Sequence, residues 1–256
     1  MNKSNKRITK GVILAGGHGT RLRPITNYIN KHLVPVFDRP MIEYPLATLK
    51  SCGIEDILIV SGREHAGDFL EYLGAGNDYC CNFTYKVQDK IDGKYGGIAQ
   101  ALGLAKDFIG NDETFAVVLG DNIFGDSMDL SLKDGKEAKV FLKKVNDADR
   151  FGVARFDINK EIESIVEKPK DIKHGYAVTG LYVYPNSVFD VVSRMRPSAR
   201  GELEITDVNQ YYARMKMLDY EILDGYWSDA GTPESLARST QWAIKRVQED
   251  IKNVKD

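Results

Sequence analysis

The chain has 256 residues, of which 43% are hydrophobic, so it can bury a large core. Its 35 lysines and arginines against 37 aspartates and glutamates give a formal net charge of −2, with no basic block, which argues against nucleic acid as a partner. No apolar run approaches the roughly 18 residues of a membrane span, and the charged N-terminus lacks an apolar segment typical of a signal peptide. We therefore expect no membrane association and a cytoplasmic location.

Short β-rich runs alternate with helical patterns along the chain, which predicts an α/β fold with a Rossmann-like, mainly parallel sheet flanked by helices. The expected strands cover residues 11–15, 56–61, 83–88, 115–119, 139–145, 152–157, 162–166, 177–184 and 220–223. The expected helices cover residues 41–52, 64–73, 97–108, 186–195, 207–215 and 233–254. The later strands favour an inserted antiparallel portion that binds a sugar. No linker interrupts the chain, so we expect one domain over residues 1–256, with a core at about 10–238.

The first expected strand runs into a glycine-rich turn, in the segment GVILAGGHGTRLRPITNYINKHLVP of residues 11–35. Glycines let backbone N–H groups approach phosphate oxygens without an intervening Cβ. Arg21 and Lys31 follow and would supply positive charge, so the pattern predicts a nucleoside triphosphate site. The residues expected to line it are Leu14, Ala15, Gly16, Gly17, Gly19, Thr20 and Arg21.

Two better-known glycine loops fail on spacing. A P-loop requires a lysine directly after its last glycine, and the third glycine of a dinucleotide fingerprint would fall on Leu22. An ordinary strand-to-helix turn remains an alternative for the glycine pattern alone. The basic residues downstream favour phosphate binding.

Two aspartates are candidate metal ligands. Asp121 directly follows the expected strand 115–119, and ligands of open α/β sheets lie outside the carboxyl ends of the strands. Carboxylates at such a position suit Mg²⁺, which binds one or two of them together with phosphate oxygens. Asp229 lies just before the expected helix at residue 233. A turn residue for Asp121 and a helix cap for Asp229 are the alternatives.

Seven segments of the sequence resemble, in order, those of the sugar-nucleotide pyrophosphorylases, and in particular a short form of the glucose-1-phosphate thymidylyltransferases. The segments are AGGHGTRL, NKHLVP, LGDN, VEKP, AVTGLY, PSARGELEITD and WSDAGT. The resemblance extends from residue 10 to about residue 238, and PSARGELEITD points most sharply to the thymidylyltransferases. It implies the nucleotide-diphospho-sugar transferase fold.

The resemblance also implies an activity: Mg²⁺-dependent transfer of dTMP from dTTP to glucose 1-phosphate, which feeds deoxysugar and cell-surface polysaccharide synthesis. Arg21 and Lys31 would be the catalytic cations, and Asp121 and Asp229 the metal ligands. Base recognition would fall to Gln88 and Gly97. The sugar phosphate would be held by Gly152, Glu167, Lys168, Val178 and Arg200. A homodimer or homotetramer is implied as well.

The residue chemistry agrees with several of these roles. The amide of Gln88 offers one donor and one acceptor, which match the O4 and N3–H edge of thymine or uracil. The last expected helix, 233–254, carries an apolar stripe that we expect to dock on the body or on a second subunit. The stripe consists of Leu236, Ala243, Ile244, Val247 and Ile251.

The sequence departs from the family pattern at three places. The segment between Gln88 and Gly97 is a few residues longer than usual, which leaves Gly96 as an alternative to Gly97. His32 stands where many relatives have glutamine. The sequence ends about 20 to 40 residues sooner than many relatives, so feedback regulation is expected to differ.

Three other functions remain open. A uridylyl- or cytidylyltransferase acting on a related sugar 1-phosphate is the nearest. A non-catalytic subunit that senses sugar nucleotides would be expected to have lost Lys31 or an aspartate, and all are present. An NAD-dependent dehydrogenase is disfavoured by the missing third glycine.

Overall fold

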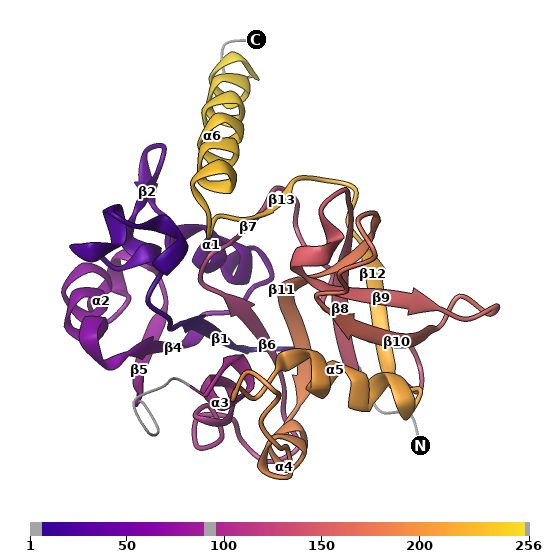
Figure 1. Cartoon of the computed structure of the whole chain (residues 1–256). Helices are drawn as coiled ribbons and strands as arrows, with labels where there is room; N and C mark the ends of the chain where they lie inside the picture. The colour runs from indigo at the N-terminus through magenta and orange to yellow at the C-terminus, as the bar shows by residue number, and fades with distance from the viewer. Residues whose placement is uncertain (1–6, 90–95, 254–256) are drawn as a thin grey trace.

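The computed structural model describes residues 7–89 and 96–253 and contains a twisted central sheet with helices against both faces (Figure 1). The strands of its main path follow the order β10-β9-β11-β6-β1-β4-β5, and β8 pairs with β11 and β12. Their bounds are β1 (Lys10–Ala15), β4 (Asp56–Gly62), β5 (Asn82–Gln88), β6 (Thr114–Leu119), β8 (Ala138–Val145), β9 (Gly152–Phe156), β10 (Ile162–Glu167), β11 (Gly175–Pro185) and β12 (Leu218–Ile222).

The sheet is mixed, as predicted. Strand β1 pairs in parallel with β4 and β6, and β4 pairs in parallel with β5. Strand β11 runs antiparallel to β6, β8 and β9, and β10 runs antiparallel to β9. The parallel half holds the glycine-rich loop, and the antiparallel half is the predicted inserted portion.

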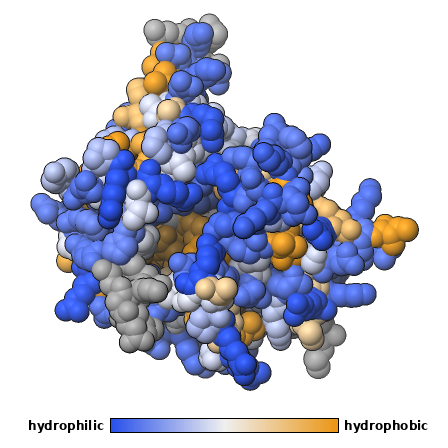
Figure 2. Space-filling view, in the orientation of Figure 1, coloured by the Kyte–Doolittle hydropathy of each residue, from blue (hydrophilic) through white to orange (hydrophobic). Residues whose placement is uncertain are grey.

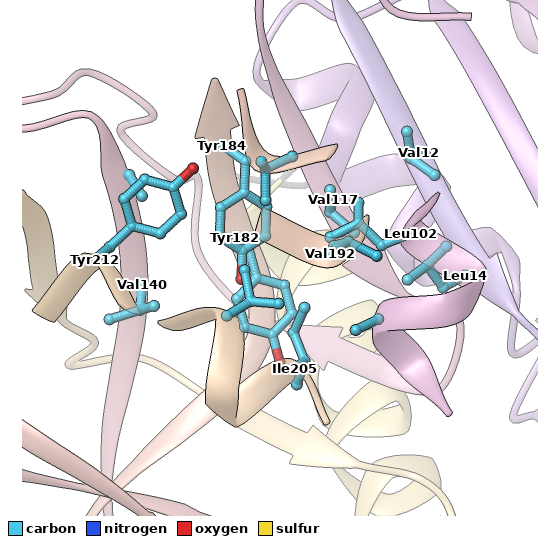
Figure 3. Close-up of a cluster of buried hydrophobic side chains, with 14 of the residues drawn as sticks. Val12, Leu14, Leu102, Val117, Val140, Tyr182, Tyr184, Val192, Ile205 and Tyr212 are labelled. Carbon is cyan, nitrogen blue, oxygen red and sulfur yellow. The ribbon is translucent and has the colours of Figure 1, made fainter. Parts of the chain in front are cut away.

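Helices cover both faces because side chains alternate along the strands. On β1, Val12 and Leu14 belong to a core cluster beneath α3, α4 and α5, part of which Figure 3 shows. Ile13 and Ala15 join the opposite cluster with α1 and α2. The helices are α1 (Glu43–Ser51), α2 (Ala66–Leu73), α3 (Ile98–Gly103), α4 (Val188–Ser193), α5 (Ile205–Arg214) and α6 (Pro233–Asn253).

Predicted and observed elements agree to within a few residues at most of their ends and differ most in two respects. Helix α3 is shorter than the predicted stretch 97–108, because after Gly103 the backbone N–H groups of 104–106 bond to the third carbonyl back rather than the fourth. Four short strands were not predicted: β2 (Pro35–Val36), β3 (Arg39–Pro40), β7 (Asn122–Phe124) and β13 (Trp227–Asp229). Among the described helices, none is both long and apolar enough to cross a bilayer.

Candidate active site

The glycine-rich loop leaves the carboxyl end of β1 and folds over Lys31. Gly19 adopts a positive φ of 59°, and a Cβ at this position would lie 2.8 Å from the Cβ of Lys31. Glycine is therefore required for this close approach. Thr26 fixes the turn, because its hydroxyl donates to the carbonyl of Gly19 at 2.7 Å.

Lys31 crosses from this loop to the end of β6. Its Nζ donates to Oδ2 of Asp121 at 2.7 Å, and the two side chains are only 15% and 12% exposed. Asn122 donates to the other oxygen, Oδ1, at 2.9 Å. Burial alone would raise the pKa of Asp121, but the charge of Lys31 and these hydrogen bonds hold that pKa well below its usual value.

A strand pair brings the second aspartate beside the first. Strand β13 runs antiparallel to β7 with Asp229 opposite Asn122, and the N–H of Ala230 donates to the carbonyl of Asp121 at 2.8 Å. Asp229 does not cap α6, since that role falls to Thr232, whose hydroxyl accepts from the N–H of Ser235. The capping alternative is therefore wrong for Asp229.

Arg150 holds the Asp229 carboxylate in a forked contact, with Nη2 at 2.9 Å from Oδ2 and 3.2 Å from Oδ1. Burial raises the pKa of Asp229 to about 6, and the neighbouring charge of Asp121 adds to the rise. Arg150 and Arg21 oppose that rise with their positive charges. The carboxylates are thus close enough to repel each other.

Arg21 reaches the same place from the short 3₁₀ helix η1 (Thr20–Leu22). A Cβ on Gly231 would lie 3.1 Å from Nη2 of Arg21 and 3.3 Å from Oδ2 of Asp121. The structure therefore gathers Arg21, Lys31, Asp121 and Asp229, which the sequence spreads over more than 200 residues, into one cluster of alternating charge.

His32 packs behind this cluster with 1% of its surface exposed. The side-chain oxygen of Asn30 accepts from the backbone N–H of His32 at 2.8 Å and from its Nδ1 at 3.0 Å. Burial lowers the pKa of the imidazole well below its usual value, and the charge of Lys31 lowers it further. His32 is thus a neutral residue that supports the loop from within.

The predicted base-recognition residues meet where β5 ends and α3 begins. Nε2 of Gln88 donates to the carbonyl of Gly97 at 3.2 Å and to Oε1 of Gln100 at 2.8 Å. Both amide hydrogens are therefore engaged, and only the acceptor Oε1 is left. The expectation that Gln88 offers a donor as well as an acceptor is corrected in this respect.

Gly97 rather than Gly96 adopts the strained backbone conformation. Its φ is +88°, and a Cβ there would lie 2.6 Å from the carbonyl oxygen of Leu203. Both backbone groups of Leu203 are hydrogen-bonded to this segment. Its N–H donates to the carbonyl of Gly96 at 2.7 Å, and its carbonyl accepts from the N–H of Ala99 at 3.1 Å. Most of the longer segment before Gly96 lies outside the described residues.

The predicted sugar-phosphate residues form a second cluster in the antiparallel half. Glu167 lies directly opposite Gly152 across β10 and β9, and Val178 on β11 comes level with Gly152 because Ala177 pairs with Val153. Nζ of Lys168 lies 3.1 Å from Oε1 of Glu167.

Two neighbours complete the environment of Glu167. Nη2 of Arg200 lies 3.2 Å from Oε1 of Glu167, and the hydroxyl of Thr206 donates to Oε2. Arg200 also pairs with Glu204, next to Leu203, at 2.8 Å. The base-recognition segment and the second cluster are thus joined through one short stretch of backbone.

The two clusters lie next to each other. Arg150, which holds Asp229, comes two residues before Gly152, and Gly180, two residues after Val178, donates its N–H to Oδ1 of Asn122 at 2.8 Å. The space-filling view shows a hollow in the middle of this face, with hydrophobic residues at its floor and hydrophilic residues around it (Figure 2). This arrangement can hold two anionic molecules next to each other.

Sequence reasoning missed three residues that organise the site: Arg150, Gln100 and Thr206. Asn122 was quoted only as part of LGDN, yet its Oδ1 accepts from the N–H of Gly180 and from Trp227, both at 2.8 Å. Its place in a family-like segment could have revealed it. Arg150 carried no comparable signal, because its partner Asp229 is 79 residues away.

Among the described residues, no group of three or more histidine, cysteine, aspartate or glutamate side chains gathers as a protein-only metal site. The adjacent carboxylates of Asp121 and Asp229 nevertheless fit a Mg²⁺ ion, because this ion commonly takes one or two carboxylates and completes its shell with substrate phosphates and water.

Known proteins of one family resemble the chain over most of its length. Residues 10–245 match the family model described as nucleotidyl transferase. A glucose-1-phosphate thymidylyltransferase of Neisseria meningitidis serogroup A is 44% identical over 252 residues, covering 96% of this chain and 85% of the relative. The enzyme of the same name from Xanthomonas campestris pv. campestris is 46% identical over 246 residues, covering 93% and 81%.

Solved structures show the same fold. A Bacillus anthracis protein, named as a candidate glucose-1-phosphate thymidylyltransferase and crystallised with sucrose, aligns with a TM-score of 0.83 and 49% identity, over 92% of this chain and 95% of that one. A UDP-glucose pyrophosphorylase in complex with UDP-glucose aligns with a TM-score of 0.79 and 26% identity, over 93% and 99%.

Proposed function

Because this chain belongs to the nucleotidyl transferase family, we propose that it transfers dTMP from dTTP to glucose 1-phosphate and releases dTDP-glucose and pyrophosphate. One observation carries the proposal: the cluster of Arg21, Lys31, Asp121 and Asp229 lies next to a second cluster that is suited to a sugar phosphate. The product would feed deoxysugar and cell-surface polysaccharide synthesis.

The reaction requires no protein nucleophile. A phosphate oxygen of glucose 1-phosphate, which is ionised at neutral pH, attacks the α-phosphorus of dTTP while pyrophosphate leaves on the opposite side. Catalysis then consists of positioning two anions and neutralising their charge. Lys31 and Arg21 would bind the triphosphate, and their common position at the glycine-rich loop supports this role.

The nucleotide would lie along this loop. Leu14 and Ala15, at the end of the paired strand β1, would lie beside the nucleotide, and backbone N–H groups of the loop residues Gly16, Gly17, Gly19 and Thr20 would donate to phosphate and sugar oxygens. Oε1 of Gln88 would accept from N3–H of the base, and the N–H of Gly97 would donate to O4.

Asp121 and Asp229 would hold a Mg²⁺ ion, which supplies charge neutralisation at the phosphates when it is bound. The chain's own residues keep these carboxylates ionised and oriented. Lys31 and Asn122 fix Asp121, and Arg150 fixes Asp229. A bound triphosphate offers Lys31 and Arg150 new anionic partners and so releases carboxylate oxygens.

Glucose 1-phosphate would bind in the second cluster. The carboxylate of Glu167 can accept from two sugar hydroxyls, while Lys168 and Arg200, which lie beside it, would bind the phosphate. Gly152 and Val178 lie level with Glu167 on the neighbouring strands and would form the apolar floor beneath the sugar ring.

We further propose that residues 1–256 fold as one domain, that the enzyme is a homodimer or homotetramer, and that it works in the cytoplasm, where its substrates are made. Helix α6 supports the second point, because its last turns extend away from the body (Figure 1).

A panel of sugar 1-phosphates against dTTP, UTP, CTP and GTP, followed by pyrophosphate release, tests the proposal. We expect dTTP with glucose 1-phosphate to give the highest kcat/KM and UTP to come second. Thymine differs from uracil by one methyl group, and a contact with this group changes kcat/KM by only about 10- to 200-fold. A higher value with UTP would make the protein a uridylyltransferase, and binding without turnover would make it a sensing subunit.

A further inference from the structure

Gln100, on α3, lies between the two parts of the base-recognition segment. Its Oε1 accepts two hydrogen bonds, one from the backbone N–H of Gly96 and one from Nε2 of Gln88, both at 2.8 Å. Nε2 of Gln88 donates its second hydrogen to the carbonyl of Gly97 at 3.2 Å. Gln100 therefore contacts both the chain that carries Gly97 and the side chain that would read the base.

Backbone groups fix which way both amides point. A backbone N–H can only donate, so the atom of Gln100 that faces Gly96 must be the oxygen. A backbone carbonyl can only accept, so the atom of Gln88 that faces Gly97 must be the nitrogen. Turning the Gln88 amide by 180° would set its oxygen against the carbonyl of Gly97 and against Oε1 of Gln100, which are both acceptors.

The remaining atom of the Gln88 amide faces the glycine-rich loop. A Cβ on Gly16 would lie 2.7 Å from Oε1 of Gln88, so this oxygen points at the first glycine of the loop. Within the described part of the chain, no donor is hydrogen-bonded to it. Gln88 as a whole is only 3% exposed, so its amide is held within the body of the protein.

We propose that Gln100 is a positioning residue that makes the base site select pyrimidines with an N3–H group. The inference rests on the proposed function, in which Gln88 faces the base. Thymine and uracil donate from N3, whereas cytosine presents a lone pair there and would repel Oε1. A site built to accept from an N–H can reject an analogue that lacks it by about 10⁴-fold.

The test compares dTTP with dCTP on three variants. In wild-type protein we expect kcat/KM with glucose 1-phosphate to favour dTTP by at least about 10³-fold. Gln100→Leu removes the shorter of the two hydrogen bonds that orient the Gln88 amide and leaves only the 3.2 Å bond to the carbonyl of Gly97, so the amide can turn more readily and present its N–H groups to cytosine. We expect the preference to fall at least about tenfold, chiefly through KM for the nucleotide and with little change in kcat.

Gln100→Glu is the conservative rescue, because a carboxylate accepts from both Gly96 and Gln88. Among the described residues, no acceptor is hydrogen-bonded to Nε2 of Gln100, so replacing this nitrogen by an oxygen breaks no hydrogen bond. We expect it to keep the wild-type preference. Gln248→Leu, on the exposed face of α6, is the remote control and should behave as wild type.

Calorimetric binding of dTTP and dCTP without the sugar phosphate provides a second readout, in which the Kd ratio should follow the KM ratio. Folded Gln100→Leu with an unchanged preference would overturn the proposal, as would loss of preference in folded Gln100→Glu. If circular dichroism shows that Gln100→Leu is unfolded, the preference of Gln100→Glu for dTTP over dCTP alone tests the proposal. Failure of wild-type protein to use any pyrimidine triphosphate would instead overturn the proposed function.

Discussion

At the scale of single residues, the site is defined by cations that bind carboxylates. Lys31 holds Asp121 and Arg150 holds Asp229, and both carboxylates are largely buried. The sequence predicted Lys31 and the aspartates as separate binders of phosphate and metal, and it offered no sign of Arg150. Which carboxylate a cation binds depends on how the fold brings distant segments together, and residue types alone do not reveal this.

Replacing Lys31 by methionine should lower kcat by about 100- to 1,000-fold, because a cation that stabilises the triphosphate in the transition state is lost. It should also lower the free energy of unfolding by about 1 to 3 kcal/mol, since Asp121 loses a partner in a buried setting. Steady-state kinetics and urea denaturation measure the two effects.

Lys10→Met is the matched control for Lys31→Met. Lys10 is also a partly buried lysine in an ion pair, with Nζ 2.9 Å from Glu113, but it lies at the start of β1, away from the site. Its replacement should change kcat by less than about twofold. Equal kcat losses in the two variants would remove Lys31 from the catalytic residues.

Asp229 gives the folded protein a pH dependence of stability. Its pKa is raised from 3.8 to about 6, so the folded state holds the proton more tightly than the unfolded chain does. The free energy of unfolding therefore falls as the pH rises from 4 through 6. At pH 8 Asp229 is ionised in both states, and this decrease in stability is complete.

Asp229→Asn should consequently raise the free energy of unfolding by about 1 to 3 kcal/mol at pH 8 and change it little at pH 4. Urea denaturation in EDTA at both pH values measures the difference, with Glu249→Gln on α6 as an exposed control. An equal effect at both pH values would show that the carboxylate does not titrate as described.

At the scale of elements, the long helices and strands were predictable and the short strands were not. Strand β1 is a continuous apolar run, and helix α6 carries an apolar stripe over many residues. Strands β7 and β13 have three residues each and pair across about a hundred residues of sequence, so no period identifies them. These two short strands nevertheless bring Asp121 and Asp229 together.

Gly97→Ala should damage the base-recognition segment. A Cβ there would press on the carbonyl oxygen of Leu203 at 2.6 Å, in a backbone conformation with a φ of +88°. We expect KM for dTTP to rise at least about tenfold and the melting temperature to fall. Because Leu203 leads into Glu204, the partner of Arg200, KM for glucose 1-phosphate should rise as well.

Gly135→Ala separates strain from contact in this experiment. Gly135 has a φ of +78°, but nothing lies within 4 Å of an added Cβ. Both variants share a backbone cost of about 1 to 2 kcal/mol. Kinetics of Gly135→Ala that match those of Gly97→Ala would mean that the contact with Leu203 has no role in substrate binding.

At the scale of the whole molecule, α6 is packed at its beginning and free at its end. Ser235, Ser239 and Ala243 are buried, and Trp242 stacks on Tyr226 with ring centroids 4.5 Å apart. Ile251, near the end of the apolar stripe, is 51% exposed. The predicted docking of the stripe on the body is thus confirmed at Leu236 and Ala243, whereas Ile251 near its end is exposed.

We expect the wild-type protein to be a dimer or tetramer, with the second half of the stripe at a subunit contact. Val247→Glu combined with Ile251→Glu should weaken assembly, whereas Gln248→Glu on the neighbouring exposed face should not. Light scattering at micromolar concentration measures the mass. A wild-type species of only 28.7 kDa would contradict the expectation.

The central claim is that one site joins a nucleotide to a sugar phosphate, and ³¹P NMR of the reaction tests it most directly. With dTTP, glucose 1-phosphate and Mg²⁺, the account predicts that signals of a sugar-linked nucleoside diphosphate and of pyrophosphate grow together in equal amounts. It also predicts that dTTP stays unchanged when glucose 1-phosphate is omitted. Cleavage of dTTP without the sugar phosphate, or no sugar nucleotide in its presence, would contradict the account.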